Sequence, residues 1–256
     1  MPVPVIILRH GQSQWNVENR FTGWVDVPLT SKGEEEARQA GALIRSKGLK
    51  VDLAFTSFLK RAANTCELVL ESLNQTGIPI HADWRLNERH YGALSGLNKS
   101  ETAAKYGEAQ VHLWRRSFSV RPNPMTPDHP HFTAIDPKYL QAGLSESDIP
   151  LTECLADTVV RVEAFWNEQL LPCLRSGKKP LIAAHGNSLR ALLKLLAGLS
   201  ENEVLELNIP TAQPMVLEFD DQFKLQSRQY LADPAVIEAA LAEIAQQGKA
   251  QPVALG

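Results

Sequence analysis

Two apolar runs in this 256-residue chain each end in a His-Gly pair. VPVIIL, at 3–8, leads into His10 and Gly11 after one arginine, and PLIAA, at 180–184, leads directly into His185 and Gly186. Successive apolar residues are typical of a strand that is buried on both faces, as in parallel sheets covered by helices. We therefore expect an α/β fold in which both histidines follow the carboxyl ends of strands.

The rest of the chain alternates between strand-like and helix-like patterns, which predicts a three-layer sandwich with a mostly parallel central sheet flanked by helices. We treat residues 1–256 as a single domain, because there is no internal repeat or low-complexity linker. Ser31 and Glu34 form a capping-box pattern for the first long helix, and Gly48 suits its end. Pro172 should end or kink the helix at about 153–171. Further strands are predicted at 51–57, 78–83 and 215–220.

Two segments depart from this alternation. Residues of about 95–149 contain one predicted helix ending in HLWRRS and then five prolines between Arg121 and Pro137. A long irregular segment inside a compact domain is more often functional than a plain connector, so we expect a helical and Pro-rich excursion over the active site. Residues of about 232–256 are helix-like and then fade into small and polar residues, which predicts a C-terminal tail that is mobile at its end.

The composition excludes several classes of function. A net charge of −3 argues against broad nucleic-acid binding, although a local arginine cluster can still bind a small anion. The sequence contains no apolar stretch long enough to span a membrane, and the N-terminus does not resemble a signal peptide. Cys66, Cys154 and Cys173 lie in apolar, helix-like contexts without CxxC spacing. They are typical of reduced thiols, and we expect a cytoplasmic protein.

Cationic and imidazole side chains should gather at one edge of the predicted sheet, because ligands of open α/β sheets bind outside the carboxyl ends of the strands. Arginine presents a planar fork to phosphate oxygens, and a neutral imidazole is a nucleophile near pH 7. There is no metal-binding pattern, so these groups must neutralise the charge of a phosphoryl group themselves. A carboxylate is also needed to move a proton. The residues expected at this edge are Arg9, His10, Asn16, Arg61, His185 and Asn187.

A structural role for either histidine is the alternative. One His-Gly pair alone is more often part of the core than part of a site. Two such pairs after apolar runs in one α/β chain are much less likely to arise by chance. We read the paired loop histidines His129 and His131 as solvated rather than as metal ligands.

Four blocks of sequence occur in order and at family-like spacing: RHGQSQWNVENRFTGWVDVPLTSKG, ERHYGALSGLNKSE, WRRS and AHGNSLRALLKLL. With them, nearly the whole chain resembles the 2,3-bisphosphoglycerate-dependent phosphoglycerate mutases of the histidine phosphatase superfamily. RHG alone indicates the superfamily, whereas the second and third blocks are more specific for the mutases.

The resemblance implies interconversion of 2- and 3-phosphoglycerate in glycolysis and gluconeogenesis. It implies a phosphohistidine enzyme, 2,3-bisphosphoglycerate as primer and no metal. His10 would be the nucleophile and Glu88 the proton donor and acceptor, while His185, Arg9 and Arg61 would stabilise the phosphoryl group. Family members are often dimers or tetramers, so a homodimer or homotetramer is expected. The implied substrate-binding residues are Ser13, Asn16, Thr22, Gly23, Arg89, Tyr91, Lys99, Arg115, Arg116, Gly186 and Asn187.

Other readings stay open. A phosphatase or a bisphosphoglycerate mutase of the same superfamily would use the same histidines, and a non-catalytic module for phospholigands is more remote. The Pro-rich loop and the tail are candidate lids, with Lys249 available to a closed tail. Gln12 stands where the family usually has Glu, and Ala212 stands where Gly is common. Neither change removes a residue that the mechanism needs.

Overall fold

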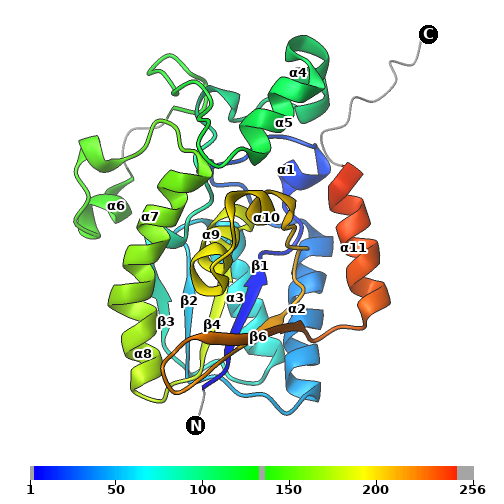
Figure 1. Cartoon of the computed structure of the whole chain (residues 1–256), viewed down its shortest axis with the longest axis vertical. Helices are drawn as coiled ribbons and strands as arrows, with labels where there is room; N and C mark the ends of the chain where they lie inside the picture. The colour runs from blue at the N-terminus through cyan, green and yellow to red at the C-terminus, as the bar shows by residue number, and fades with distance from the viewer. Residues whose placement is uncertain (1–2, 133–135, 247–256) are drawn as a thin grey trace.

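The computed structural model describes residues 3–132 and 136–246 of the chain. Within them, six strands form one sheet in the order β3-β2-β4-β1-β5-β6, with helices on both sides (Figure 1). The four strands from β3 to β1 are parallel, and β5 and β6 add an antiparallel edge. The predicted three-layer α/β sandwich with a mostly parallel sheet is therefore confirmed. The strands are β1 (Val5–Arg9), β2 (Leu53–Thr56), β3 (Ile80–Ala82), β4 (Pro180–Ala184), β5 (Met215–Phe219) and β6 (Leu225–Tyr230).

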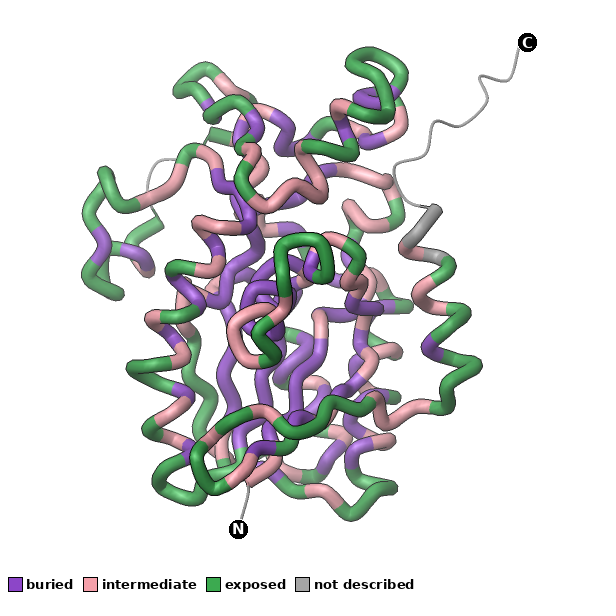
Figure 2. Tube along the Cα trace, in the orientation of Figure 1, coloured by how far each residue is buried: buried purple, intermediate pink, exposed green. Residues whose placement is uncertain are grey.

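The first strand shows why its apolar residues are uninterrupted. Val5 and Ile7 pack into one hydrophobic cluster with the helices of one face, and Ile6 and Leu8 pack into a second cluster on the other face. Successive side chains of a strand point to opposite faces, so burial on both sides requires an apolar residue at every position. Buried residues are accordingly concentrated in the central strands (Figure 2).

The helices form the two outer layers and the excursion. Helices α2 and α3 pack together over the cluster that contains Ile6, and α7 and α9 pack together over the cluster that contains Val5. The α-helices are α1 (Gln14–Val17), α2 (Ser31–Ser46), α3 (Lys60–Ser72), α4 (Lys99–Tyr106), α5 (Glu108–Arg116), α6 (Pro137–Gln141), α7 (Leu155–Phe165), α8 (Leu171–Arg175), α9 (Gly186–Ala197), α10 (Glu201–Glu206) and α11 (Pro234–Gln246). Shorter 3₁₀ turns are η1 (Trp84–Leu86), η2 (Gly92–Leu94) and η3 (Glu146–Asp148).

Pro172 changes the helix that precedes it, as expected. A π-helical segment, η4 (Trp166–Leu170), separates α7 from α8, and Pro172 lies in the first turn of α8. Proline lacks the N–H that an α-helix would use and crowds the carbonyl four residues earlier. The wider π turn removes that conflict without ending the helix.

The end of α2 lies where the sequence predicted it, whereas its start does not. The N-cap is Thr30, whose side chain accepts a hydrogen bond from the N–H of Gly33, so the capping box predicted at Ser31 and Glu34 is wrong by one residue. Gly48 has φ +70°, a left-handed conformation that glycine adopts without steric cost, and it follows the C-cap as predicted.

The excursion contains more helix than the sequence indicated. Instead of one helix it has α4, α5 and the short α6, with α4 and α5 at the top of Figure 1 and α6 at the left. The predicted tail at 232–256 begins with α11, and Lys249 lies outside the described residues. Across the described ranges, no helix is both long enough and apolar enough to cross a membrane.

Candidate active site

His10 and His185 lie side by side because their strands are neighbours. β1 and β4 pair in parallel with Arg9 opposite Ala184, and each histidine is the next residue along its strand. The backbone N–H of His10 also donates to the carbonyl of Ala184 at 2.9 Å. The ring centroids are 5.0 Å apart, and both side chains are almost completely buried.

The surroundings of His10 favour a neutral ring with a free Nε2. Nδ1 lies 2.7 Å from the carbonyl oxygen of Gly11, which can only accept, so Nδ1 carries the proton. Burial, followed by the positive charges of Arg61 and Arg9, holds the pKa of His10 well below its usual value. A neutral imidazole with an unprotonated Nε2 is the form that can attack phosphorus.

His185 begins α9 as its N-cap residue and contacts a serine that sequence reasoning did not single out. Its Nε2 lies 2.7 Å from Oγ of Ser57, the residue directly after β2, and Oγ also accepts from the N–H of Leu59. Burial, followed by the positive charge of Arg61, holds the pKa of His185 well below its usual value. A negative charge bound beside the ring would raise this pKa.

Arg61 and Arg9 supply positive charge beside the two rings. Arg61, in the first turn of α3, donates to the carbonyls of Gly23 and Val25 at 2.8 and 2.9 Å. Burial lowers its pKa to about 10, which leaves it charged at neutral pH. Arg9 donates through Nη1 to the carbonyl of Ile209, while its buried Nε has no partner within the described structure.

Glu88 is the carboxylate of the site. Its Oε1 accepts from the backbone N–H of Arg89, from the backbone N–H of Asn187 and, at 2.8 Å, from the side-chain amide of Asn187. The amide of Asn187 also lies 3.3 Å from the hydroxyl of Tyr91. All three bonds go to Oε1, and Oε2 accepts none that the described structure shows.

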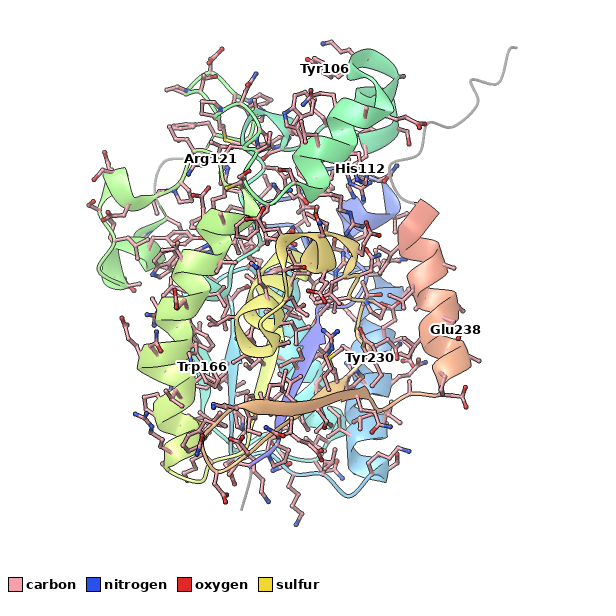
Figure 3. The ribbon with its side chains drawn as sticks, viewed as in Figure 1. Tyr106, His112, Arg121, Trp166, Tyr230 and Glu238 are labelled. Atoms are coloured by element: carbon pink, nitrogen blue, oxygen red, sulfur yellow. The ribbon has the colours of Figure 1, made fainter. Side chains whose placement is uncertain are left out.

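A small cationic cavity of about 90 Å³ unites eight of the predicted residues. Lys99 begins α4, and Arg115 and Arg116 end α5, the helix that carries His112 in Figure 3. Burial and the nearby arginines lower the pKa of Lys99 to about 7 and that of Arg115 to about 10. The predicted residues that line the cavity are Arg9, Glu88, Tyr91, Lys99, Arg115, Arg116, Gly186 and Asn187.

The other predicted binding residues are not among those that line this cavity. Ser13 is fully buried and donates through Oγ to Oδ1 of Asn16. Thr22 is buried, and Gly23 has φ +56° in the loop that accepts from Arg61. Ser13 thus belongs to the loop that follows β1. Thr22 and Gly23 belong to the segment that accepts hydrogen bonds from Arg61.

Arg89 differs most from what the resemblance implies. Its side chain is completely buried and donates to the carbonyls of Trp114 and Arg115 at the end of α5. Its guanidinium carbon lies 4.5 Å from the centroid of the Tyr91 ring. The structure therefore places Arg89 behind the site, where it holds the end of α5, rather than on the cavity.

Five residues that line the cavity were not predicted: Arg190, Leu207, Asn208, Ile209 and Ile244. Arg190 donates to Oδ1 of Asn187, Asn208 accepts from Arg116, and Ile244 of α11 brings the C-terminal helix to the site. The spacing of Asn187 and Arg190 by three residues in a helix was a usable signal. No comparable signal exists for Ile244.

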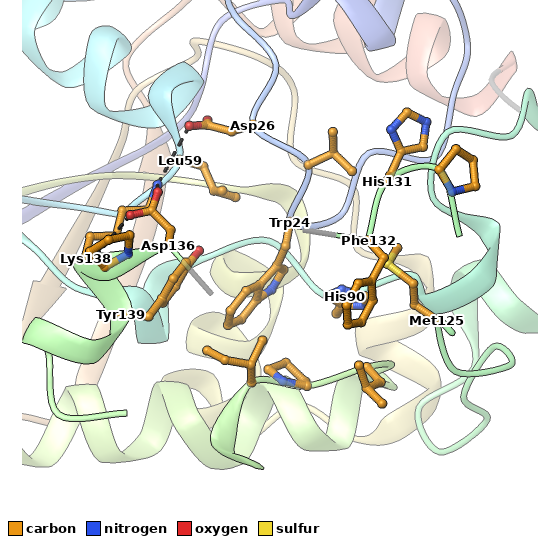
Figure 4. Close-up of a pocket in the computed structure, with 16 residues that line it drawn as sticks. Trp24, Asp26, Leu59, His90, Met125, His131, Phe132, Asp136, Lys138 and Tyr139 are labelled. Atoms are coloured by element: carbon orange, nitrogen blue, oxygen red, sulfur yellow. Dashed lines mark hydrogen bonds and ion pairs between the residues drawn. The ribbon is translucent and has the colours of Figure 1, made fainter. Parts of the chain in front are cut away.

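A second, larger cavity of about 520 Å³ lies under the Pro-rich excursion (Figure 4). Trp24 and Tyr139 stack there with centroids 5.2 Å apart, and Lys138 lies between Asp26 and Asp136. Its walls are mainly aromatic and apolar. His10 and His185 line neither this cavity nor the smaller one, whose Arg9 and Gly186 are their neighbours in the chain. Unlike the smaller cavity, the larger one has no arginine among the described residues that line it. Among the described residues, no group of three or more His, Cys, Asp or Glu side chains has the arrangement of a metal site.

Comparisons with known proteins agree with this geometry. Among solved structures, the chain is similar to mycobacterial hydrolase 1, with 21% identity, a TM-score of 0.68, and coverage of 91% of this chain and 100% of that one. It is also similar to a mycobacterial glucosyl-3-phosphoglycerate phosphatase in complex with VO3, with 22% identity, a TM-score of 0.66, and coverage of 89% and 97%. A phosphoglycerate mutase from Bacillus anthracis str. Sterne matches at 19% identity and a TM-score of 0.65, with 97% of each chain covered. At these identities the likeness concerns the fold.

The family is shown by a separate match. The model of the histidine phosphatase superfamily (branch 1) matches residues 5–136 and 128–229, which include both histidines and Glu88. That superfamily is one of enzymes, with phosphatases and mutases among them. This chain belongs to branch 1 of the histidine phosphatase superfamily.

Proposed function

We propose that this protein is a phosphoglycerate mutase that interconverts 2- and 3-phosphoglycerate and is primed by 2,3-bisphosphoglycerate. The observation that carries the proposal is the density of positive charge around one small cavity. Among the described residues that line it, five are cationic and Glu88 is the one carboxylate. The cationic residues are Arg9, Lys99, Arg115, Arg116 and Arg190.

This charge exceeds what one phosphoryl group needs. His10, His185, Arg9 and Arg61 already supply donors for a transferring phosphoryl group at the strand ends. Lys99 and Arg115 come from the excursion and add cations on another side of the cavity. A substrate with two phosphates and a carboxylate matches that arrangement, whereas hydrolysis of a monophosphate leaves the second group of cations without a purpose.

The first transfer starts from phosphorylated His10, for which 2,3-bisphosphoglycerate supplies the phosphoryl group. The free hydroxyl of a monophosphoglycerate attacks the phosphorus, and its proton passes to the carboxylate of Glu88. The new O–P bond forms as the P–Nε2 bond breaks, which returns His10 to its neutral form. The arginines and His185 stabilise the charge on the phosphoryl oxygens throughout.

The second transfer runs in the opposite direction on the other phosphate. His10 Nε2 attacks that phosphorus, the ester P–O bond breaks, and Glu88 gives its proton back to the leaving oxygen. The product is the isomeric monophosphoglycerate and a phosphorylated His10. Water must be excluded between the two transfers, or the phosphohistidine is hydrolysed. No metal is part of this proposal.

A coupled assay tests the assignment. Conversion of 3-phosphoglycerate to 2-phosphoglycerate is followed with and without 2,3-bisphosphoglycerate, while free phosphate is measured in the same samples. We expect conversion that depends on the primer, with little phosphate released. Phosphate release that exceeds isomerisation would instead identify a phosphatase of the superfamily.

Two further proposals follow from the same assignment. A cytoplasmic location fits an enzyme of glycolysis and gluconeogenesis with reduced cysteines. Assembly into a homodimer or homotetramer is proposed from the family resemblance, and sedimentation equilibrium of the purified chain tests it.

A further inference from the structure

A buried ion pair lies directly behind the segment that carries Glu88. Arg161 lies within α7, Glu153 lies just before that helix, and the two residues are 6% and 3% exposed. Nε and Nη2 of Arg161 donate to the two carboxylate oxygens of Glu153 at 2.8 and 3.1 Å. Neither residue lines the cationic cavity, so the pair can act on a ligand there only through its neighbours.

Arg161 uses every donor of its guanidinium. Besides the two bonds to Glu153, Nη1 donates to the carbonyls of Arg85 and Asn87 at 2.6 and 2.9 Å. Nη2 donates to the carbonyl of Glu88 at 3.1 Å. Three carbonyls between 85 and 88 are therefore held by one rigid, planar group. Lysine could not replace it, because an ammonium is a compact charge without the fork.

Glu153 holds the same segment on the other side of Glu88. Its Oε2 accepts from the backbone N–H of His90 at 2.7 Å, and its own backbone N–H donates to the carbonyl of His90 at 2.9 Å. The main chain is thus tied at Glu88 and again two residues later. Between these ties, the carboxylate of Glu88 reaches Asn187 at the cavity.

We propose that Arg161 and Glu153 are positioning residues that set the place of the Glu88 carboxyl group for proton transfer. The inference rests on the role of Glu88 in the proposed function. A buried ion pair is weak evidence of a stabilising role, because desolvation offsets much of the attraction between the charges. A role in positioning is better supported than a role in stability, because a catalytic group misplaced by about 1 Å can lower a rate by about 10²-fold.

The test compares two phosphate esters in the step that phosphorylates His10. In both, Nε2 attacks phosphorus and the ester P–O bond breaks. p-Nitrophenolate leaves as a stable anion without a proton, whereas the alkoxide that leaves 2,3-bisphosphoglycerate must be protonated by Glu88. First-turnover rates are measured by rapid quench for the bisphosphate and by the nitrophenolate burst for the aryl ester. Glu88→Gln gives the reference pattern. Its rate of phosphorylation should fall strongly with 2,3-bisphosphoglycerate, the alkyl ester, and only slightly with p-nitrophenyl phosphate, the aryl ester.

Arg161→Lys and Glu153→Gln should reproduce that pattern. We expect phosphorylation by 2,3-bisphosphoglycerate to slow by about 10²-fold in Arg161→Lys, with KM little changed, because the substrate contacts are untouched. Phosphorylation by p-nitrophenyl phosphate should slow far less. The double variant Arg161→Lys/Glu88→Gln should be no slower than Glu88→Gln alone, because both changes act on the same group.

Arg121→Lys is the matched control. Arg121 forms a bidentate ion pair with Asp157 of the same helix α7, but this arginine is exposed and makes no contact with the segment at 85–90 in the described structure. Arg121→Lys should leave both rates unchanged. Circular dichroism spectra and melting temperatures verify that each variant is folded. If Arg161→Lys does not fold, the comparison is made with Glu153→Gln instead.

The outcomes separate this inference from the proposed function. If the wild-type protein is phosphorylated by neither ester, the phosphohistidine mechanism is wrong. The positioning role is overturned if the wild-type protein is phosphorylated and the variants show either of two results. In the first, phosphorylation slows equally with both esters, and in the second it slows with neither. Absence of mutase activity in an enzyme that is still phosphorylated would reject only the mutase assignment.

Discussion

The imidazole rings of His10 and His185 lie 5.0 Å apart with their planes tilted by 59°. Their strands are adjacent although the residues are far apart in the chain, because β4 inserts between β1 and β2 in the sheet. A phosphoryl group on Nε2 of His10 would therefore lie within reach of the second ring. In the proposed mechanism, one ring attacks phosphorus and the other stabilises charge.

His10→Ala should remove the phosphoenzyme and lower mutase turnover by about 10⁴-fold or more, since the nucleophile has no substitute. Acid-labile phosphate on the protein and the coupled assay measure the two effects. His112→Ala is the control, because His112 is exposed on α5 (Figure 3) and should leave both unchanged. Undiminished turnover in His10→Ala would reject the nucleophile assignment.

Lys99→Met should weaken binding of phosphorylated ligands by about 10- to 100-fold, the range for losing a hydrogen bond to a charged group. Burial and Arg115 lower the pKa of Lys99 to about 7, so the free enzyme loses this charge as pH rises above 7. The affinity of the wild-type protein should fall over that range, and Lys99→Met should lack this dependence. Calorimetric titration with 2,3-bisphosphoglycerate measures it.

The same pKa predicts an effect on stability without ligand. Between about pH 7 and the ordinary lysine pKa of 10.5, the unfolded chain binds a proton at Lys99 that the folded chain has lost. The free energy of unfolding should therefore rise with pH in this window, and below it the charged, buried lysine is destabilising. Lys99→Met should remove that rise in denaturant titrations, whereas Lys105→Met, on the exposed face of α4, should keep it.

Gly33→Ala should destabilise the protein by about 3 kcal/mol or more and impair phosphorylation of His10. A Cβ at Gly33 would lie 2.0 Å from the carbonyl oxygen of Gln12, a backbone atom that cannot rotate away. The start of α2 would be pushed from the loop that follows His10. Gly77→Ala is the control, because its Cβ would meet nothing within 4 Å. Equal melting temperatures for the two variants would contradict this account.

Gln12→Glu should have little effect on the lifetime of the phosphoenzyme. The side chain of Gln12 accepts a hydrogen bond from Oγ1 of Thr30, the N-cap of α2, which holds that side chain at the start of the helix. A carboxylate near a helix N-terminus is favourable by about 0.3–1 kcal/mol. We expect a small gain in stability and a hydrolysis rate changed by less than about tenfold, equivalent to roughly 1.4 kcal/mol in activation free energy. A larger change would mean that residue 12 acts on the phosphohistidine.

Ala212 shows how a departure from the family pattern is accommodated. It has φ +48°, a left-handed conformation that glycine adopts more easily, and it is almost fully buried. Its N–H donates to the carbonyl of Arg9 at 2.9 Å, which ties this loop to the end of β1. The backbone therefore keeps the form that glycine would adopt, at some steric cost.

The layers of the fold and the edge that gathers the candidate site could be predicted from the sequence. Runs such as VIIL and PLIAA have to be buried on both faces, and a parallel sheet brings the residues after its strands to one edge. The edge strand β6 could not be predicted in this way, because LQSRQY is mostly exposed and lacks an apolar pattern.

Only the tertiary structure decided which side chains line the cavity and which hold it in place. The sequence analysis placed Arg89 and Arg115 together among the ligands of phosphate and did not single out Arg161. In the structure, Arg89 and Arg161 are spent on buried backbone carbonyls, and Arg115 lines the cavity. A buried guanidinium is costly unless most of its donors are bonded, and the carbonyls that accept from Arg89 and Arg161 come from segments that only folding brings together.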